Sequence, residues 1–280
     1  MKNISKLISE ALKEDGAGHD ITTLALIPRD DASEAFIIAK TSGVIFGLAI
    51  AQMIFKNLDR LARCRFLCKE GQRAKSGQKI FHIKAKTRAI LSGERTALNF
   101  LTHLSGIATT TAEFVARVRP FRAKVLDTRK TTPGLRALEK QAVKAGGGVN
   151  HRADLSSMVL IKDNHRLARR KKMPLVQKIL AAKKTGKPVE VEVDNLNEFK
   201  IVLGASPDII LFDNMPPAAI KRAVSMTRSW RGKKPLLEAS GGVNLKNIRA
   251  IAKTGVDRIS VGALTHSRKT MDLSLELIQK

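Results

Sequence analysis

Short apolar runs alternate with amphipathic stretches over the second part of the chain. The predicted strands are 124–126, 157–161, 189–193, 209–211, 236–238 and 258–261. The predicted helices are 135–145, 175–184, 196–203, 217–227 and 245–254, with a last helix at 272–279. This alternation is typical of parallel strands joined by right-handed crossovers.

The first part of the chain has a mixed pattern. The predicted elements are a helix at 6–14, a polar turn in which Asp20 is an N-cap or a turn former, a strand, glycine turn and strand over 33–48, a helix at 49–61, and strands at 64–69 and 79–86. A long helix is predicted over 92–118, with a break near Ser105–Gly106. This order indicates a small α+β unit ahead of the alternating region.

Polar residues follow the strands of the alternating region. Asp194 follows strand 189–193 and Asp213 follows the run that begins at 209. This arrangement fits a barrel whose site lies at the carboxyl ends of the strands. A complete (β/α)8 barrel takes about 250 residues, and far fewer remain after residue 124. We therefore expect a short or incomplete α/β barrel of six or seven strands.

The charge of the chain is strongly basic, with 51 Lys and Arg against 25 Asp and Glu and a formal net charge of +26. A nucleic-acid partner would favour a basic stripe with aromatic residues for stacking. The cations are instead spread along the chain, aromatic residues make up 4%, and tyrosine is absent. We expect no specific nucleic acid and interpret the basic run 166–172 as a solvated helix end or loop. An anionic substrate explains some of the cations, and a proteome-wide basic drift stays open for the rest.

Two features bear on the compartment. Cys64 and Cys68 lie four residues apart in a strand-like run, where a disulfide is geometrically impossible and two thiols alone make a poor metal site. Residues 1–14 carry Glu10 and Glu14 among apolar positions and so predict an amphipathic helix instead of a signal or transit peptide. The longest apolar stretches, such as 43–54, are too short to span a membrane. We expect a cytoplasmic protein.

Cationic side chains gather at the ends of two predicted strands. Arg129 and Lys130 follow strand 124–126, Lys162 follows strand 157–161, and His151 and Arg152 lie between them. Cations that are gathered at strand ends cannot all face bulk water, so their natural partner is a compact polyanion.

Two glycine-rich segments, EASGGVN and ISVGALTHS, each follow a strand near the end of the chain, and after the first a helix is expected at once. Backbone N–H groups at such positions bind phosphate, and the last strands of a barrel are its usual phosphate site. Alone, Gly241, Gly242 and Gly262 could simply permit tight turns. Two such segments in succession favour phosphate binding.

Acidic residues also lie at or near strand ends. Glu190 and Glu192 share one face of their strand, and Asp213 follows another. Glu192 and Asp213 suit ribose hydroxyls or Mg²⁺ carried with a pyrophosphate, or they serve as counter-ions to the cations. His151 has no Ser or Cys elbow near it, and no Cys/His set has zinc spacing.

These motifs carry a resemblance to a known family. The stretches EDGAGHDITT, GERTALNFLTHLSGIAT, DTRKTTPGLRALEKQAVKAGGGVNHR, VLIKDNH, VEVEVDNL, ILFDNM, LEASGGVN and DRISVGALTHS occur in order along nearly the whole chain. Together they resemble quinolinate phosphoribosyltransferase. The resemblance implies a decarboxylating glycosyltransferase (pentosyltransferase) of NAD biosynthesis, which converts quinolinate and phosphoribosyl pyrophosphate to nicotinate mononucleotide, pyrophosphate and CO₂. RLARRKKMP after His165 departs from the run of apolar and small residues common in the family, so the shape of that loop is in question.

The resemblance also implies an architecture. It predicts an N-terminal α/β sandwich over 1–106, onto which a helix at 271–280 packs back, and an open α/β barrel over 107–270. The family works as a homodimer, with some hexameric members, and each site is completed by the partner chain.

The resemblance assigns roles to residues of this sequence. Arg129, His151, Arg152 and Lys162 hold the quinolinate carboxylates, and Arg95 reaches into the neighbour's site. Lys130, Lys162, Glu192 and Asp213 contact phosphoribosyl pyrophosphate and its Mg²⁺, with Glu192 and Asp213 binding the metal directly or through the substrate. The phosphate loops are Ser240, Gly241, Gly242, Gly262 and Ala263.

The chemistry expected of this site requires no acid–base pair. Glu192 and Asp213 would stabilise an oxocarbenium-like ribose, and Lys130 and Lys162 the departing pyrophosphate. Two other classes stay open, namely a binding-only relative and a nucleic-acid-binding protein. A related family linked to molybdenum transport is disfavoured because KDNH, residues 162–165, is intact.

Overall fold

The computed structural model describes residues 2–167, 173–267 and 269–278, which form two compact units. The first unit contains Met1–Thr110, Lys144–Gly146 and Arg268–Lys280, and the second contains Thr111–Val143 and Gly147–Ser267. Most of the basic run that the sequence singles out, residues 168–172, lies outside the described residues.

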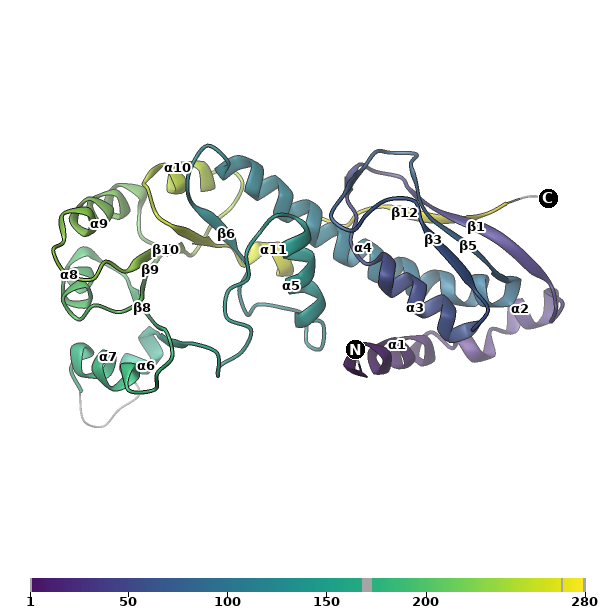
Figure 1. Cartoon of the computed structure of the whole chain (residues 1–280), viewed down its shortest axis with the longest axis horizontal. Coiled ribbons are helices and arrows are strands. Elements are labelled where there is room, and N and C mark those ends of the chain that lie inside the picture. Colours follow the sequence, from purple (N-terminus) through teal and green to yellow (C-terminus); the bar gives the residue numbers. More distant parts are fainter. Residues whose placement is uncertain (1, 168–172, 268, 279–280) are drawn as a thin grey trace. The chain divides into compact units, whose positions relative to one another are not determined.

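The first unit is a two-layer α/β sandwich. Its antiparallel sheet has the order β12-β1-β5-β3, formed by Leu273–Leu277, Ala32–Ala39, Lys79–Lys86 and Arg63–Phe66. A short pair, β2 (Gly43–Val44) and β4 (Arg73–Ala74), stands apart. The helices are α1 (Lys2–Glu14), α2 (Ile21–Leu26), α3 (Leu48–Leu58) and the first part of α4 (Thr87–Val118), with a 3₁₀ turn at Ala17–His19. Figure 1 shows α3 beneath the sheet, where Phe55 packs against Phe81 with ring centroids 6.1 Å apart.

Side-chain alternation explains this sheet. Ala35, Ile37 and Ala39 are buried on β1, as expected for a strand with one face on the core. Of its two predicted roles, Asp20 has that of N-cap, because its side chain accepts the Thr23 N–H at 3.0 Å at the start of α2. Cys64 lies in β3 and Cys68 lies beyond its end, so the predicted strand 64–69 is shorter than expected. Both thiols are free.

Two predictions about helices are wrong. The segment predicted as a helix at 272–279 contains strand β12, which pairs antiparallel with β1. Its leucines recur every second residue, which is a strand period, and β1 offers an unpaired edge that a helix could not satisfy. Helix α4 continues without a break through Ser105–Gly106, where a Cβ on Gly106 would lie 2.3 Å from the Lys269 carbonyl oxygen. Glycine therefore serves close packing here.

The second unit holds a six-stranded parallel sheet with the order β6-β11-β10-β9-β8-β7. These strands are β6 (Lys124–Leu126), β7 (Val159–Ile161), β8 (Val189–Val193), β9 (Ile209–Asp213), β10 (Leu236–Ser240) and β11 (Arg258–Ser260). Strands β6 and β7 are the two ends of the sheet, so the barrel is open, and six strands agree with the predicted six or seven.

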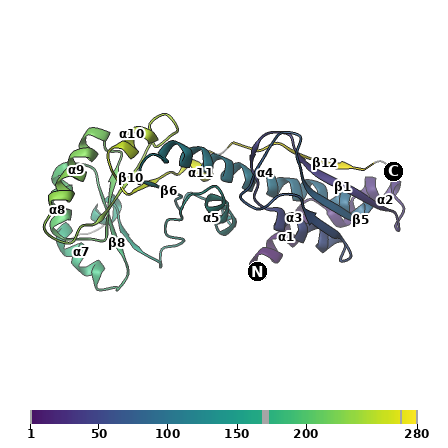
Figure 2. The same cartoon turned by 45° about the horizontal axis from the view of Figure 1, so that its top comes forward.

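Helices connect and flank these strands. They are α5 (Arg136–Ala145), α6 (Asp163–Leu167), α7 (Leu175–Lys183), α8 (Leu196–Gly204), α9 (Pro217–Ser229), α10 (Ile248–Lys253) and α11 (Ala263–His266). Figures 1 and 2 show α8 and α9 outside strands β8 and β10. Every residue of β8 is buried, and Phe199 of α8 packs on Phe212 of β9 with ring centroids 5.7 Å apart. This packing fixes the strands whose carboxyl ends carry the site.

Within the described residues, no helix has both the length and the apolar content that a membrane span requires.

Candidate active site

A pocket of about 770 Å³ lies at the carboxyl ends of the parallel strands. Twelve of the thirteen predicted site residues line it: Arg129, Lys130, His151, Arg152, Lys162, Glu192, Asp213, Ser240, Gly241, Gly242, Gly262 and Ala263. Arg95 is not among the lining residues and lies exposed on α4. A second cavity of about 560 Å³, lined by residues such as Leu236 and Asp257, lies where β10 and β11 begin. Of these two cavities, the one at the carboxyl ends combines cations, acids and glycine-rich backbone at the end where ligands bind in open α/β sheets.

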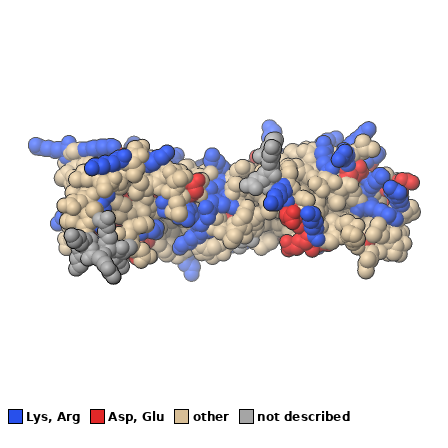
Figure 3. Space-filling view, turned by 90° about the horizontal axis from the view of Figure 1, so that it is seen from below, with Lys and Arg blue, Asp and Glu red and all other residues tan. Residues whose placement is uncertain are grey.

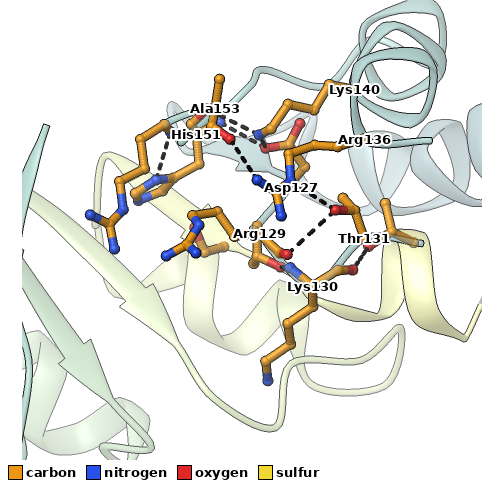
Figure 4. Close-up of polar contacts among 12 residues, drawn as sticks. Asp127, Arg129, Lys130, Thr131, Arg136, Lys140, His151 and Ala153 are labelled. Atoms are coloured by element: carbon orange, nitrogen blue, oxygen red, sulfur yellow. Dashed lines mark hydrogen bonds and ion pairs between the residues drawn. The ribbon is translucent and has the colours of Figure 1, made fainter. Parts of the chain in front are cut away.

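A buried ion pair supports the loop that carries His151 and Arg152. Lys140 on α5 pairs with Asp127, which follows β6, and both side chains are almost wholly buried. Asp127 Oδ1 accepts the His151 backbone N–H at 2.9 Å, and Lys140 donates to the His151 carbonyl at 3.1 Å. With its amide turned to satisfy both neighbours, Asn150 donates to Asp127 Oδ2 at 2.7 Å. Figure 4 shows Lys140 and Asp127 meeting beside this backbone, with Arg129 and Lys130 extending away from them.

The ring of His151 lies against two buried carboxylates. Its Nε2 is 3.1 Å from Glu190 Oε2 and 3.3 Å from Glu238 Oε1. Both glutamates are fully buried, and Arg258 pairs with Glu238 at 2.7 Å. The His151 Nδ1 accepts the backbone N–H of Arg152 at 2.8 Å.

Burial and charge act in opposite directions on this cluster. Burial disfavours a charged imidazole, but Glu190 and Glu238 outweigh it and raise the pKa of His151 to about 9. Burial also raises the pKa of Glu190, whereas His151 and Arg258 hold the pKa of Glu238 below its usual value despite burial. A second proton on the ring would have to sit on Nδ1, which already accepts an N–H. In this geometry the Arg152 N–H occupies Nδ1 and so holds the ring in its neutral form, against the two carboxylates that raise the pKa of His151.

Two guanidinium groups converge on the pocket. The Nε of Arg129 is buried and has no hydrogen-bond partner among the described residues. Arg152 donates from Nη1 to the Met158 carbonyl at 3.1 Å. Burial, together with the nearby charge of Arg129, lowers the pKa of Arg152. A bound anion would relieve both the repulsion and the unsatisfied donor.

A second group of charges follows β7, β8 and β9. Lys162 Nζ lies 2.9 Å from Glu192 Oε2, and Asp213 Oδ2 accepts from the Asn214 amide at 3.0 Å. The counter-ion reading thus holds for Glu192. Carboxylate oxygens are also the ligands that Mg²⁺ prefers, so Glu192 and Asp213 fit a cation brought in with a phosphate.

The glycine loops differ from each other. Gly241 and Gly242 have φ of +89° and +58°, and a Cβ on Gly241 would lie 2.2 Å from Asn214 Oδ1. Helix α10 begins only at Ile248, because Asn244 first forms a turn that accepts the Lys246 and Asn247 N–H groups. The expectation of a helix immediately after the first loop is therefore wrong. Helix α11, in contrast, begins at Ala263, directly beyond Gly262.

Nine pocket residues were not among the predicted site residues: Thr128, Leu160, Asp163, Leu211, Asn214, Glu238, Val243, Ser260 and His266. Glu238 carried a readable signal, since a carboxylate stands between Leu237 and Ala239 within an apolar strand. The pairing of Lys140 with Asp127 left no signal in the sequence, because Lys140 looks like any lysine on a helix.

On the face seen in Figure 3, Lys and Arg are scattered over both units and form no continuous stripe. This face gives no support to the nucleic-acid alternative.

Comparisons with known proteins agree with one another. A family model described as the quinolinate phosphoribosyl transferase N-terminal domain matches residues 20–105, and the C-terminal domain model matches 107–276. A nicotinate-nucleotide pyrophosphorylase (carboxylating) of Mycobacterium leprae is 42% identical over 96% of this chain and 95% of its own length. A probable enzyme of the same name from Bacillus subtilis is 38% identical over 98% of this chain and 93% of its own length.

Solved structures give the same result. Nicotinate-nucleotide pyrophosphorylase from Francisella tularensis superposes with a TM-score of 0.92 at 39% identity, covering 99% of this chain and 96% of its own. The protein of that name from Ehrlichia chaffeensis gives 0.90 at 35% identity, covering 98% of each chain.

Proposed function

The chain belongs to the quinolinate phosphoribosyltransferase family, and we propose that the pocket at the strand ends of its second unit is where the family reaction occurs. The protein is a phosphoribosyltransferase of de novo NAD biosynthesis, that is, a pentosyltransferase. It converts quinolinate and phosphoribosyl pyrophosphate to nicotinate mononucleotide, pyrophosphate and CO₂. The observation that carries the site assignment is the unsatisfied Nε of Arg129 beside Arg152, since two guanidinium groups in one pocket match a dicarboxylate.

We assign quinolinate to the side of the pocket formed by Arg129, Arg152 and Lys162. Planar guanidinium groups grip carboxylates bidentately, which would orient the pyridine ring as well as neutralise its charge. Nicotinate has a single carboxylate and would leave one of these cations without its partner, so the pair supports a preference for the dicarboxylate.

We assign phosphoribosyl pyrophosphate and its Mg²⁺ to the opposite set of groups. Glu192 and Asp213 would hold the ribose and the substrate-bound cation, while Lys130 and Lys162 face the pyrophosphate. The loops at Ser240–Gly242 and at Gly262 and Ala263 offer backbone for the phosphate, because at Gly241 even a Cβ would be crowded. When bound, Mg²⁺ would neutralise the charge of the departing pyrophosphate.

The proposed reaction balances without a protein acid–base pair. The quinolinate nitrogen attacks ribose C1 as the C1–O bond to pyrophosphate breaks, and the ring nitrogen becomes cationic. The adjacent carboxylate then leaves as CO₂, its electron pair stays on the ring carbon beside the cationic nitrogen, and that carbon takes a proton from solvent. The protein's task is to hold the nitrogen in line and to stabilise charge on ribose and pyrophosphate.

We further propose a homodimer, or a hexamer, in which Arg95 completes the neighbouring site. Arg95 is exposed on α4, which leaves it available to a second chain. On α2 the side chains of Ile21, Leu24 and Leu26 are also exposed, and Ile21 keeps 81% of its surface. An apolar face of this kind supports an interface between copies.

We also propose that the protein works in the cytoplasm. The free thiols of Cys64 and Cys68 are compatible with a reducing compartment.

The test is release of CO₂ from carboxyl-labelled quinolinate by the purified protein with Mg²⁺ and phosphoribosyl pyrophosphate. We expect release that depends on phosphoribosyl pyrophosphate and disappears without Mg²⁺. Nicotinate, the matched monocarboxylate, should give no nucleotide product. Folded protein that releases no CO₂ would refute the assignment, and equal use of nicotinate would refute the role of the paired guanidinium groups.

A further inference from the structure

Both ring nitrogens of His151 are engaged by the protein itself, although the ring borders the pocket. Nε2 faces Glu190 and Glu238, and Nδ1 accepts the Arg152 backbone N–H. Only 7% of the side chain is exposed. We infer that His151 is a positioning residue that acts through Arg152, with Glu190 and Glu238 fixing its ring, instead of binding a substrate carboxylate itself. The inference rests on the proposed function and assigns His151 a different role from the one that the family resemblance implies.

The Nε2 side of the ring is set by two rigid strands. Glu190 is the second residue of β8, where both neighbouring residues are also buried, and Glu238 lies within β10. Arg258 forms an ion pair with Glu238 and Ser260 donates a hydrogen bond to it, whereas neither carboxylate oxygen of Glu190 has a hydrogen-bond partner among the described residues. A donor at Nε2 is therefore required in the cluster, and this places a proton on that nitrogen.

The Nδ1 side of the ring fixes the loop. A backbone N–H can donate only to an unprotonated nitrogen, and the N···N distance of 2.8 Å leaves no room for a second proton between them. With Nε2 carrying the proton, His151 is the neutral tautomer and joins the backbone of Arg152 to the floor of the pocket. The Asp127 carboxylate holds the other side of the same loop by accepting the His151 N–H.

The result is that Arg152 is held at two points. Its backbone is held through His151, and its Nη1 donates to the Met158 carbonyl. Its guanidinium is thus placed beside Arg129 against the repulsion between the two charges. If the ring lost its acceptor nitrogen, that repulsion would be free to move Arg152 away from the carboxylate it is proposed to bind.

The charged groups around the ring come from several elements: Glu190 of β8, Glu238 of β10, Arg258 of β11, Arg129 and Asp127 after β6, Lys140 of α5, and Arg152 beside it. The carboxylates favour a second proton on the ring, and the Arg152 N–H opposes it. A ring protonated on both nitrogens and a ring that accepts the Arg152 N–H are mutually exclusive, because both require Nδ1.

Substitutions can separate the two sides of the ring. His151→Asn keeps an acceptor at the Nδ1 position and loses the donor toward the glutamates. His151→Gln reaches the glutamates and loses the acceptor at Nδ1, and His151→Leu loses both.

We expect the quinolinate KM to rise about tenfold or more in the Gln and Leu variants, and in the Asn variant by clearly less. The KM for phosphoribosyl pyrophosphate should stay constant, and thermal stability should follow the opposite order, with Gln above Asn. Equal KM values for quinolinate in the Asn and Leu variants would overturn the inference.

A measurement without substrate tests the inference independently of catalysis. In ¹⁵N NMR of the wild-type protein at pH 7.5, His151 should show a bare Nδ1 and a protonated Nε2, its signals being those that His151→Asn removes. Protonation of both nitrogens would overturn the inference whether or not the protein releases CO₂. Failure of CO₂ release with the expected tautomer would instead refute the proposed function and leave the geometry of His151 standing.

Discussion

At the scale of single residues, Arg129 and Arg152 make the pocket favour an anionic ligand. The Nε of Arg129 is a buried donor that no described group satisfies, and Arg152 is partly desolvated beside it. Such an arrangement is unfavourable in the empty pocket and becomes favourable when a carboxylate arrives. Binding and selection of a dicarboxylate therefore share one physical origin.

Replacing either guanidinium should weaken quinolinate binding in particular. For Arg129→Ala and Arg152→Ala we expect the quinolinate KM to rise about 10- to 100-fold, because a charge-assisted hydrogen bond contributes about 1.5–3 kcal/mol. The KM for phosphoribosyl pyrophosphate should change little in steady-state CO₂-release assays. Arg→Lys at the same positions keeps the charge and loses the bidentate fork, so it should recover only part of the loss. An unchanged quinolinate KM would remove that arginine from the binding role.

Lys140 acts on stability through a buried charge. Lys140→Met would leave Asp127 uncompensated beneath the His151 loop, and we expect it to lower the free energy of unfolding by about 3–5 kcal/mol. The double variant Asp127→Asn, Lys140→Met should recover part of this loss because no unpaired charge remains. Lys144→Met, at an exposed position on the same helix, is the matched control in urea unfolding. A single variant as stable as the control would contradict the ion pair's role.

At the scale of elements, apolar runs and their alternation with helices predicted the parallel strands closely. Strands 124–126 and 189–193 end where the structure ends β6 and β8. The sequence could also place twelve residues in one pocket, because polar residues that follow parallel strands share one edge of the sheet. Two features needed more than the local pattern. The leucines of β12 have a strand period, but the pairing of this strand depends on the free edge of β1, more than 200 residues away, and the role of Lys140 depends on which way α5 faces.

The continuity of α4 depends on a glycine that permits a close approach. Gly106→Ala should lower the free energy of unfolding by about 1–3 kcal/mol, since its Cβ would meet the Lys269 carbonyl oxygen at 2.3 Å. Gly204→Ala at the end of α8 meets no atom within 4 Å and should be neutral or slightly stabilising. Chemical denaturation of both variants gives the comparison, and equal stabilities would refute the packing argument.

The first phosphate loop depends on glycine for a different reason. Gly241→Ala would force a side chain into positive φ and onto the Asn214 backbone and amide, at a cost of about 1–3 kcal/mol in backbone strain alone. We expect the loop to move, raising the KM for phosphoribosyl pyrophosphate about tenfold or more while quinolinate binding changes little. Isothermal titration gives the dissociation constant of each substrate and so separates an effect on phosphoribosyl pyrophosphate from one on quinolinate. An equal loss for both substrates would indicate general disruption of the pocket instead.

At the scale of the whole molecule, the proposed sharing of Arg95 between chains means that each pocket is active only when the partner chain supplies its Arg95. Arg95→Ala keeps an intact pocket but would deprive its neighbour, whereas Lys162→Ala has a defective pocket and an intact Arg95. In a mixed dimer, the pocket of the first chain would receive Arg95 from the second. Random mixing makes half the dimers mixed, each with one complete site, so about a quarter of wild-type activity should return.

The control for this experiment mixes two variants whose defects both lie in the chain's own pocket. Co-refolded Lys162→Ala and Arg129→Ala both have defective pockets, so no pairing of the two yields a complete site. Activity should therefore stay at the level of the separate variants. Restoration with Arg95→Ala and none with Arg129→Ala would establish that Arg95 acts across an interface. If neither mixture recovers CO₂ release although exchange of chains is confirmed by mass, Arg95 acts within its own chain or outside the reaction, and each pocket is then complete in a single copy.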